Sequence, residues 1–376
     1  MERNAYDPAA IDQPPGANPS FASDPAPPGS PPPPAPAYGA GLPPDLAYPW
    51  DPAEQRPQHR RPRVGRLLVA VVALLLLACI VRVVVFASAV STAPLWSIQL
   101  SPVGEAQVLL LGYGGQGHEG TYLTDSLLLL HSDLASGRTA QISIPRDLWV
   151  QIPPDSGRYA KINSAYAYGR GEGGDPVAGG KLATHKVEQV TGLPTERWVT
   201  IDFRGFRALV DALGGVDIEV ERAFSAQYPA NDDPTIDPSW TTVAFAAGRQ
   251  HMDGETAIRY ARARYADLPE EATDFARAQR QQRLVAAIGA KLRQPVQWWR
   301  AFAVMNALQP ALQTNLAPAD LLFLFLRADT GNATRIRIDD TNVLENATSA
   351  DGQAMLRPRG GDYELIVRYI REQLKK

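Results

Sequence analysis

The sequence predicts an α/β fold: a single exported domain with a central mixed β-sheet flanked by helices, placed after one transmembrane helix. Two observations support this prediction. Residues 67–90 form an apolar run of 24 residues that only Arg82 interrupts. From residue 104 onward, apolar runs of strand length alternate with segments of helical periodicity, as in α/β domains. No internal repeat or clear linker follows residue 104, so residues 104–376 are expected to form one domain.

Residues 1–62 are expected to form a disordered, proline-rich cytoplasmic arm. Of the 33 prolines in the chain, 18 lie in this segment. Proline lacks a backbone donor and the segment has few bulky apolar residues, so a packed core cannot form there. A flexible tail is the expected state, and binding of an SH3-like partner is the alternative.

The apolar run at 67–90 is long enough to cross a bilayer, at roughly 36 Å as a helix. Residues 63–66 are a basic juxtamembrane stretch, so the positive-inside rule places the arm in the cytoplasm. A linker at 91–103 then leads to an extracytoplasmic domain, and Arg82 can extend its guanidinium group to the far interface. A cleaved signal peptide is the alternative, but the 66 residues before the run are too many for one.

Within residues 104–376 the hydrophobic pattern predicts the elements in turn. AQVLLLGY (106–113), SLLLLHS (126–132) and TAQISI (139–144) have strand length and are expected to be neighbours. A helix over 180–192 ends at a glycine, a strand follows at 197–203, and a helix over 203–215 stops at two glycines before a strand at 216–221. Helices over 273–292 and 363–376 complete the pattern.

Composition and missing motifs exclude several classes of function. The only cysteine, Cys79, lies in the apolar run, so the exported part is expected to contain no disulfide. A net charge of −3 argues against a general nucleic-acid binder, which would show a basic excess. HExxH, paired CxxC and GxSxG motifs are absent from the sequence, so zinc hydrolysis and serine-nucleophile chemistry lack their minimum residues.

One predicted helix places cations where a solvated helix would not. In DFARAQRQQRLVAAIGAKL (274–292), helical geometry puts Arg277, Arg280 and Gln281 on the stripe that also carries Leu284. Buried guanidinium groups need an anion or a carboxylate beside them. This stripe therefore predicts an anion site, with internal salt bridges, for example to Asp274, as the alternative.

Other cations occur at Arg146 after a predicted strand, at Lys161 in YAKINSAYAYG, and at Arg262 and Arg264 in AIRYARAR. Arg262 and Arg264 share one face if the backbone is extended and diverge if it is helical, and the sequence leaves this open. Planar guanidinium groups match phosphate oxygens two at a time. If these cations converge, they would suit a diphosphate.

Asp125 opens the predicted strand in TYLTDSLLLL, and a carboxylate beside clustered cations and phosphates is a natural magnesium ligand. The alternative is a cap or turn residue. The preceding stretch GYGGQGHEG is glycine-rich, which lets backbone amides approach an anion. His118 and Glu119 lie within it and are candidates to assist a metal.

Seven stretches in order strongly resemble the LytR-CpsA-Psr family of envelope phosphotransferases, over roughly residues 104–294: VLLLGYGG, LTDSLLLLHSD, ISIPRDLWVQIP, KINSAYAYG, VTIDFRGFRALVDALGGVDIEV, GRQHMDGETAIRYARAR and DFARAQRQQ. The resemblance implies an apolar pocket for a polyprenyl-pyrophosphate-linked glycan. It also implies arginines at the mouth of that pocket that grip the diphosphate, and Mg²⁺ (or Mn²⁺) held by aspartate.

Carried over by motif, the resemblance implies that the diphosphate contacts Arg146, Lys161, Arg262, Arg264, Arg277 and Gln281. It makes Asp125 the metal ligand and Arg146, Asp125 and Arg277 the catalytic residues, with Asp147 orienting Arg146. The chain departs from the family pattern at Gly114 and Leu123, where an acidic residue and an arginine are common. Glu119 or His118 is therefore a candidate to support the metal.

The expected reaction transfers a glycopolymer phosphate from the polyprenyl-pyrophosphate-linked carrier to a peptidoglycan hydroxyl and forms a phosphodiester. The expected location is the cell membrane, crossed once, with the N-terminus in the cytoplasm and the C-terminal domain outside it, and no nucleic-acid partner is expected. Two alternatives remain: a module that binds polyprenyl phosphates without turnover, and a polyprenyl pyrophosphatase. Asp125 and Asp274 are the candidates for the general base.

Overall fold

The computed structural model describes residues 63–101, 103–118, 120–233 and 235–376. The proline-rich arm expected at 1–62 therefore lies outside the described residues.

A six-stranded mixed sheet forms the centre of the domain, with the strand order β12-β6-β1-β2-β3-β13. β1 pairs with β2 in the antiparallel sense and with β6 in the parallel sense, while β2 pairs antiparallel with β3. The predicted neighbours are thus neighbours, and the prediction of a mixed sheet is confirmed. The strands are β1 (Glu105–Tyr113), β2 (Thr124–Asp133), β3 (Thr139–Ser143), β6 (Arg197–Asp202), β12 (Leu312–Thr314) and β13 (Thr334–Arg337).

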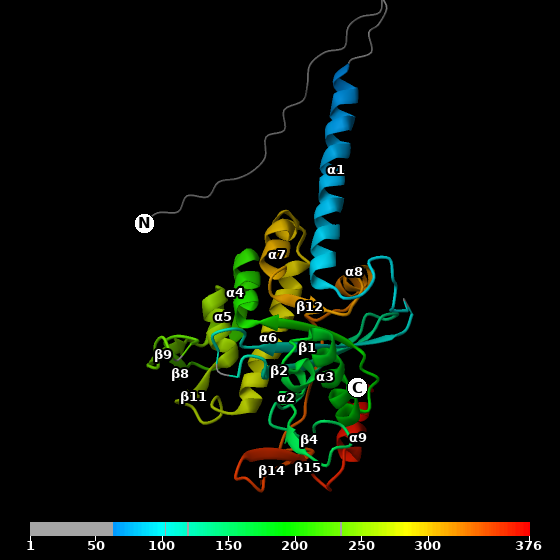
Figure 1. The fold of residues 1–376 in the computed structure, drawn as a ribbon. Coiled ribbons are helices and arrows are strands. Elements are labelled where there is room, and N and C mark those ends of the chain that lie inside the picture. Colours follow the sequence, from blue (N-terminus) through cyan, green and yellow to red (C-terminus); the bar gives the residue numbers. More distant parts are fainter. Residues whose placement is uncertain (1–62, 102, 119, 234) are drawn as a thin grey trace, which may run out of the picture. The chain divides into compact units, whose positions relative to one another are not determined.

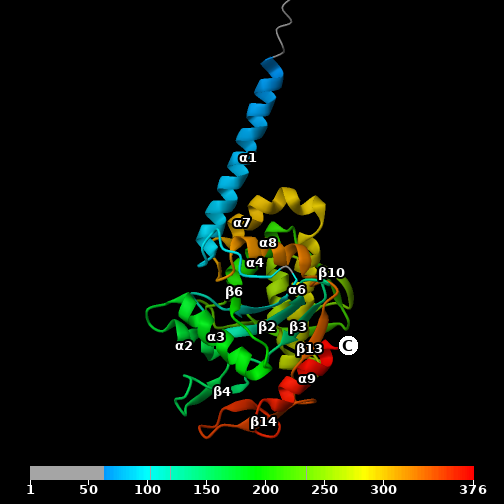
Figure 2. The ribbon, with the colours of Figure 1, turned by 90° about the vertical axis from the view of Figure 1, so that its right-hand side faces the viewer.

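Helices flank both faces of this sheet (Figures 1 and 2). The helices associated with one face are α2 (Ser164–Arg170), α3 (Pro176–Thr191) and α9 (Glu364–Leu374), and those associated with the other are α4 (Phe203–Ala212), α5 (Gly254–Arg262) and α6 (Asp274–Leu292). Local sequence sets several of their ends. The Thr273 side chain accepts a hydrogen bond from the Ala276 amide at 3.0 Å and caps α6, and Gly192 ends α3 with φ of 65°.

The central strands are apolar on both faces because each face has its own apolar surroundings. Leu109 of β1 and Leu129 of β2 belong to the main core cluster, which includes side chains of α3 and α9. Their neighbours Leu110 and Leu128 point the other way, as side chains alternate along a strand, and line a cavity bounded by α4, α5 and α6. The near-continuous leucine runs follow from this double role.

Smaller strand pairs and a second apolar cluster complete the domain. The short strands are β4 (Trp149–Gln151), β5 (Tyr159–Lys161), β7 (Val216–Val220), β8 (Phe224–Pro229), β9 (Trp240–Phe245), β10 (Gly248–Met252), β11 (Arg264–Ala266), β14 (Leu344–Thr348) and β15 (Ala354–Pro358). They pair as β4 with β5, β7 with β10, β14 with β15, and β8 between β9 and β11. Val216, Phe224 and Phe245 pack with Tyr260 of α5 and Leu284 of α6 in the second cluster, and Leu284 also lines the cavity.

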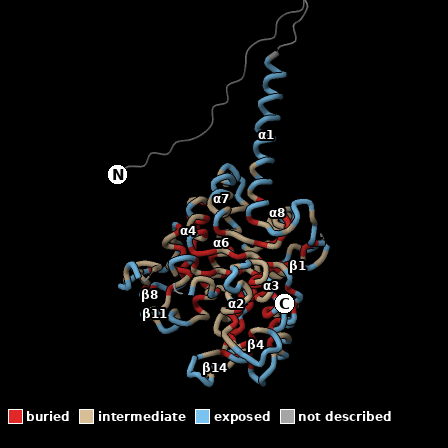
Figure 3. The backbone as a smooth tube through the Cα atoms, in the orientation of Figure 1, coloured by how far each residue is buried: buried red, intermediate tan, exposed pale blue. Residues whose placement is uncertain are grey.

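α1 (Arg63–Val90) is, among the described residues, the one helix long and apolar enough to cross a bilayer. Figure 3 shows it exposed along most of its length, while buried residues concentrate around the sheet and α6. Its last residue, Val90, is buried, and the Ser91 hydroxyl that follows donates to the Leu316 carbonyl at 2.7 Å. The remaining helices are η2 (Pro295–Arg300), α7 (Ala301–Leu308) and α8 (Pro318–Arg327).

Candidate functional site

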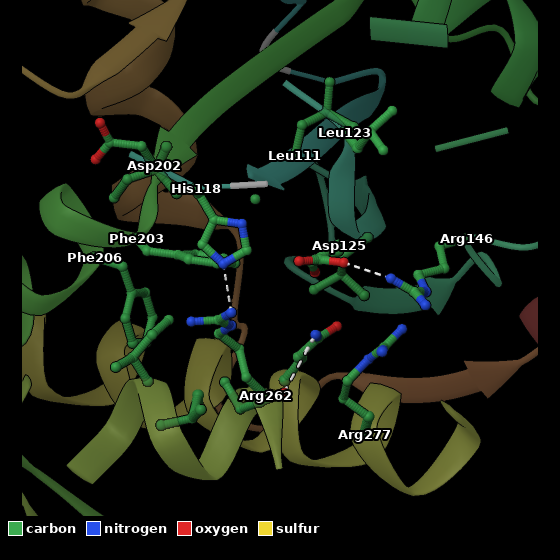
Figure 4. A pocket seen from close by; sticks show the side chains of 18 of the residues that line it. Leu111, His118, Leu123, Asp125, Arg146, Asp202, Phe203, Phe206, Arg262 and Arg277 are labelled. Carbon is green, nitrogen blue, oxygen red and sulfur yellow. Dashed lines mark hydrogen bonds and ion pairs between the residues drawn. The ribbon is translucent and has the colours of Figure 1, made fainter. Parts of the chain in front are cut away.

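A cavity of about 660 Å³ lies between the sheet and the helices α4, α5 and α6 (Figure 4). Its interior is apolar: leucines of β1 and β2 form the floor, and Phe206, Leu209, Val285 and Ile288 come from the helices. Polar side chains gather at one end, which is called the cationic mouth below. The residues of the cationic mouth are Asp125, Arg146, Arg262, Arg264, Arg277 and Gln281.

Asp125 and Arg146 meet at this mouth because their strands are adjacent. Asp125 is the second residue of β2, and Arg146 follows the end of β3, the antiparallel neighbour of β2. Arg146 Nη1 donates to Asp125 Oδ1 at 2.7 Å, and Figure 4 shows Arg277 rising from below toward this pair. The Asp147 carboxylate lies 3.4 Å from Arg146 Nε, so Asp147 holds Arg146 from the other side.

Arg262 and Arg264 both reach the cavity because the backbone changes conformation between them. Arg262 is the last residue of α5, Ala263 has φ −47° and ψ 124°, and Arg264 begins β11. Neither of the two regular geometries considered from sequence therefore applies across this pair. Arg264 Nη2 lies 3.5 Å from Asp125 Oδ1, so Arg146 and Arg264 share one carboxylate oxygen.

Arg262 is held by protein groups on several sides. Its Nη1 donates to the Tyr228 hydroxyl at 2.7 Å and to Asp232 Oδ1 at 2.6 Å. Its guanidinium group lies 4.1 Å from the centre of the Phe203 ring. This arginine is therefore fixed in place before any ligand binds.

The first turns of α6 supply Arg277 and Gln281, as the helical stripe predicts. Arg277 is only 4% exposed, and its Nη1 lies 2.8 Å from Asp274 Oδ1 without hydrogen-bond alignment. Arg280, on the same stripe, instead donates to Glu271 and to the Ala263 carbonyl, each at 2.7 Å. The salt-bridge alternative thus describes Arg280, whereas Arg277 has a salt bridge and also lines the cavity.

The electrostatic state of the cationic mouth follows from these contacts. Burial alone would raise the pKa of the Asp125 carboxyl, but the surrounding guanidinium groups, Arg146 foremost, hold that pKa below its ordinary value. Burial lowers the pKa of Arg277 to about 10, and the positive charges of Arg264 and Arg146 act in the same direction. The mouth therefore holds an ionised carboxylate and an arginine whose charge is costly without an added anion.

Lys161 lies apart from the other predicted ligands. Its Nζ is 2.8 Å from Asp147 Oδ1, and it is not among the described residues that line the cavity. Lys161 ends β5, which pairs with β4 after the Arg146 turn. It contacts the mouth through Asp147, which lies between Lys161 and Arg146.

The glycine-rich stretch brings His118 to the cavity wall. His118 Nε2 lies 2.6 Å from Arg262 Nη2, so this nitrogen faces the arginine. A Cβ on Gly114 would lie 2.5 Å from His118 Cγ, so the imidazole occupies the space that a side chain at 114 would need. Glu119, the other candidate metal support, lies outside the described residues.

The LytR_cpsA_psr family model matches residues 88–367, which is more than half of the chain. The chain belongs to this family.

Curated relatives in the family carry transferase names. The match to polyisoprenyl-teichoic acid–peptidoglycan teichoic acid transferase TagV of Bacillus subtilis is 32% identical over 48% of this chain and 42% of that protein. The match to the corresponding TagU of Bacillus cereus is 28% identical over 58% of this chain and 63% of that protein. The chain thus spans less than two thirds of the length of these relatives.

Solved structures confirm the fold. B. subtilis TagV superposes with a TM-score of 0.54 and 22% identity, covering 73% of this chain and 99% of that one. Protein gbs0355 of Streptococcus agalactiae gives a TM-score of 0.55 and 22% identity, over 73% of this chain and 89% of that one. The predicted LytR-CpsA-Psr architecture is therefore present.

Sequence reasoning missed several residues around the mouth of this family member. Asn163 and Tyr228 line the cavity, and Asp232 holds Arg262. Tyr228 lies on β8, whose strand character was not predicted, and Asp232 follows it in a loop. The sequence signal for Tyr228 is the alternation of apolar and polar residues in FSAQYP (224–229).

The described donor set fits a divalent cation only with help from a ligand. Two carboxylates occur among the described lining residues, Asp125 and Asp202, and Figure 4 places Asp202 on the far side of His118 from Asp125. Within the described residues, no three His, Cys, Asp or Glu side chains form a metal-binding group. Mg²⁺ is commonly bound by one or two carboxylates plus substrate phosphates, so Asp125 fits as a single protein ligand.

Proposed function

We propose that this protein transfers a glycopolymer phosphate from a polyprenyl-pyrophosphate-linked carrier to a peptidoglycan hydroxyl. One observation carries the proposal: an apolar cavity of about 660 Å³ ends in four arginines around Asp125, two of which, Arg146 and Arg264, form ion pairs with its carboxylate. The apolar part suits a polyprenyl chain, and the cationic mouth suits a diphosphate. The names of the TagU and TagV relatives support the same substrate classes.

The arginines would bind the diphosphate with buried N–H groups that form ion pairs but make no hydrogen bond within the described residues. Arg146 Nε and Arg277 Nη1 are buried and have no hydrogen-bond partner among the described residues. Buried donors without acceptors are costly, so phosphate oxygens placed between them would gain charge-assisted hydrogen bonds. The same groups would stabilise the charge that develops on the leaving lipid phosphate.

The reaction forms a bond between the acceptor hydroxyl oxygen and the glycan-bearing phosphorus, and it breaks the bond from that phosphorus to the lipid phosphate. Such transfers depend mainly on positioning and charge neutralisation. When bound at Asp125, Mg²⁺ or Mn²⁺ would add positive charge against the diphosphate. Because its pKa is lowered, Asp125 suits binding of cations better than removal of the acceptor proton.

α1 would anchor the protein in the cell membrane with a single pass. Its N-terminal end carries the basic residues of 63–66, which supports a cytoplasmic arm and an extracytoplasmic domain. In that orientation the cavity faces the compartment that contains peptidoglycan. Cysteine labelling from outside intact cells, at the exposed Tyr159→Cys position, would test this orientation.

The decisive experiment incubates the full-length protein with a polyprenyl-diphosphate-linked sugar and peptidoglycan oligomers. We expect a joined sugar–peptidoglycan product with the wild type and none with Arg277→Ala. Arg283→Ala is the matched control, because Arg283 lies on the same helix, pairs with Glu221 and is not among the described lining residues. Release of free phosphate without joined product would contradict the proposal and indicate a pyrophosphatase.

A second candidate is a module that binds polyprenyl phosphates without turnover. This candidate is favoured by the metal-ligand set of the cationic mouth, in which Asp125 is the one carboxylate among the described residues. A metal held by one carboxylate is bound less firmly and gives less charge neutralisation during transfer. Tight binding with no product, with Mg²⁺ or Mn²⁺ present, would select this candidate.

A further inference from the structure

The helices next to α1 expose large apolar side chains. Trp298 and Trp299 of η2 are 65% and 71% exposed, and Phe302 of α7 is 43% exposed. On α8, Leu322 and Leu326 are 59% and 65% exposed. These five residues are called the apolar rim below.

α7 is unusual for a helix of a water-soluble domain. Its sequence, AFAVMNAL, is apolar at every position except Asn306, yet none of its eight described residues is buried. A helix that is apolar all round normally lies in a core or in a membrane. Several large apolar side chains exposed on neighbouring helices of a folded domain indicate a surface that another component covers.

The position of the apolar rim relative to α1 identifies what covers it. Figures 1 and 2 both show α7 and α8 at the end of the domain where α1 arrives. Arg82 of α1 donates a hydrogen bond to Asn306 of α7, which fixes α7 level with the last turns of α1. A span that begins at residue 67 needs about 20 residues and so ends near Phe86, beyond Arg82.

We propose that the apolar rim inserts into the outer lipid–water interface around α1 and seats the domain on the bilayer. The inference rests on the proposed anchoring by α1. Tryptophan prefers this interface because its ring is amphipathic, and two adjacent exposed tryptophans lie in η2, which directly precedes α7. Arg300, whose guanidinium group lies 4.6 Å from the Trp299 ring centre, brings a cation close to the lipid phosphates.

The seating also bears on how a lipid substrate enters. β12 follows α7 in the chain, and its Leu312 lines the cavity together with Ile288 of α6. α4, whose Phe206 and Leu209 line the cavity, packs against α7, so the apolar part of the cavity adjoins a helix of the rim. A domain held against the bilayer would take up a polyprenyl chain without carrying it through water, where each exposed CH₂ is unfavourable.

Single-cysteine spin labelling of the full-length protein in lipid nanodiscs tests the inference. The wild type, labelled at its one cysteine, Cys79, reports on α1. In a Cys79→Ala background, labels are placed at Trp299→Cys and Leu326→Cys, with Tyr159→Cys of β5 as the control position at 54% exposure. Collisions with oxygen, which partitions into lipid, are compared with collisions with a water-soluble nickel chelate.

We expect the labels at positions 299 and 326 to favour oxygen and to lie about 5–10 Å below the lipid phosphates. The label at position 159 should favour the nickel chelate. A nickel-accessible label at 299 would overturn the inference, and so would a label hidden from both reagents, which would mean that a protein partner or a second copy covers the rim. Nickel access at Cys79 would instead refute the anchoring by α1.

Discussion

The substitution Arg277→Met distinguishes two possible roles of Arg277, ligand binding and stabilisation of the fold. Methionine preserves the length and apolar stem of the side chain and removes the charge. Burial lowers the pKa of Arg277 to about 10, so the folded state disfavours the charged form. At about 1.4 kcal/mol per pKa unit, this corresponds to a cost on the order of 3 kcal/mol at neutral pH. Because the pKa of Arg277 is lower in the folded state than in the unfolded state, this loss of folding stability applies in full below pH 10 and decreases as pH rises above it.

We therefore expect Arg277→Met to be as stable as the wild type or more stable, because Asp274, its partner, is 40% exposed and can be hydrated. Arg280→Met, one turn along α6, provides the contrast. It leaves the Glu271 carboxylate, which is 16% exposed, without its partner, and should lose about 3–5 kcal/mol of unfolding free energy. Chemical denaturation of the ligand-free proteins measures both changes.

Arg277→Met should weaken binding of a diphosphate ligand more than Arg280→Met does, the reverse of their effects on stability. Loss of a buried charged contact to the diphosphate should cost about 3 kcal/mol, or roughly a hundredfold in Kd, for Arg277→Met. Calorimetric titration with a short-chain prenyl diphosphate measures this, with the prenyl alcohol as the ligand that lacks phosphate. If Arg277→Met loses as much stability as Arg280→Met and keeps its affinity, Arg277 is structural and the argument is wrong.

Three further predictions follow from the same geometry. The Asp125→Asn variant should be less stable than the wild type above about pH 4, because the lowered pKa of Asp125 makes its ionised carboxylate stabilising. This difference in stability should disappear as pH falls through that pKa, and thermal melts across a range of pH values would check it. Ile288→Trp should fill the apolar interior and weaken binding of long-chain prenyl diphosphates far more than short-chain ones, and equal losses in a chain-length titration would contradict the assigned tail site. A Cβ at position 180 would lie 2.2 Å from Trp198 Cε2, so Gly180→Ala should destabilise the fold by about 1–3 kcal/mol, and unchanged denaturation midpoints would show that α3 can shift.

The sequence predicts the central elements because their signals are local. The leucine runs of β1 and β2 and the capping residue Thr273 of α6 act over a few residues, and the structure has them at nearly the expected bounds. The stripe on α6 likewise predicts that Arg277 faces inward. Family membership and the mixed sheet were predicted from ordered motifs and are confirmed.

Other features depend on contacts between segments far apart in the chain. Sequence periodicity cannot show that Arg280 pairs with Glu271, or that Tyr228 of β8 holds Arg262. The end of α5 between Arg262 and Arg264 is set by the pairing of β11 with β8, a tertiary contact. α7 was not predicted because an apolar helix without a polar face has no periodic pattern to detect. The catalytic roles of Arg146, Asp125 and Arg277 and the metal-binding role of Asp125 stay predictions.

The double role of the central strands lets two properties of the protein change independently. Leu109 of β1 and Leu129 of β2 pack in the main core cluster, whereas their neighbours Leu110 and Leu128 line the cavity. Substitutions at core-facing positions of these strands alter the stability of the domain, whereas substitutions at cavity-facing positions alter the width of the cavity that a ligand occupies. Family members with this fold can therefore accommodate ligands of different width through substitutions at the cavity-facing residues alone, without altering the core.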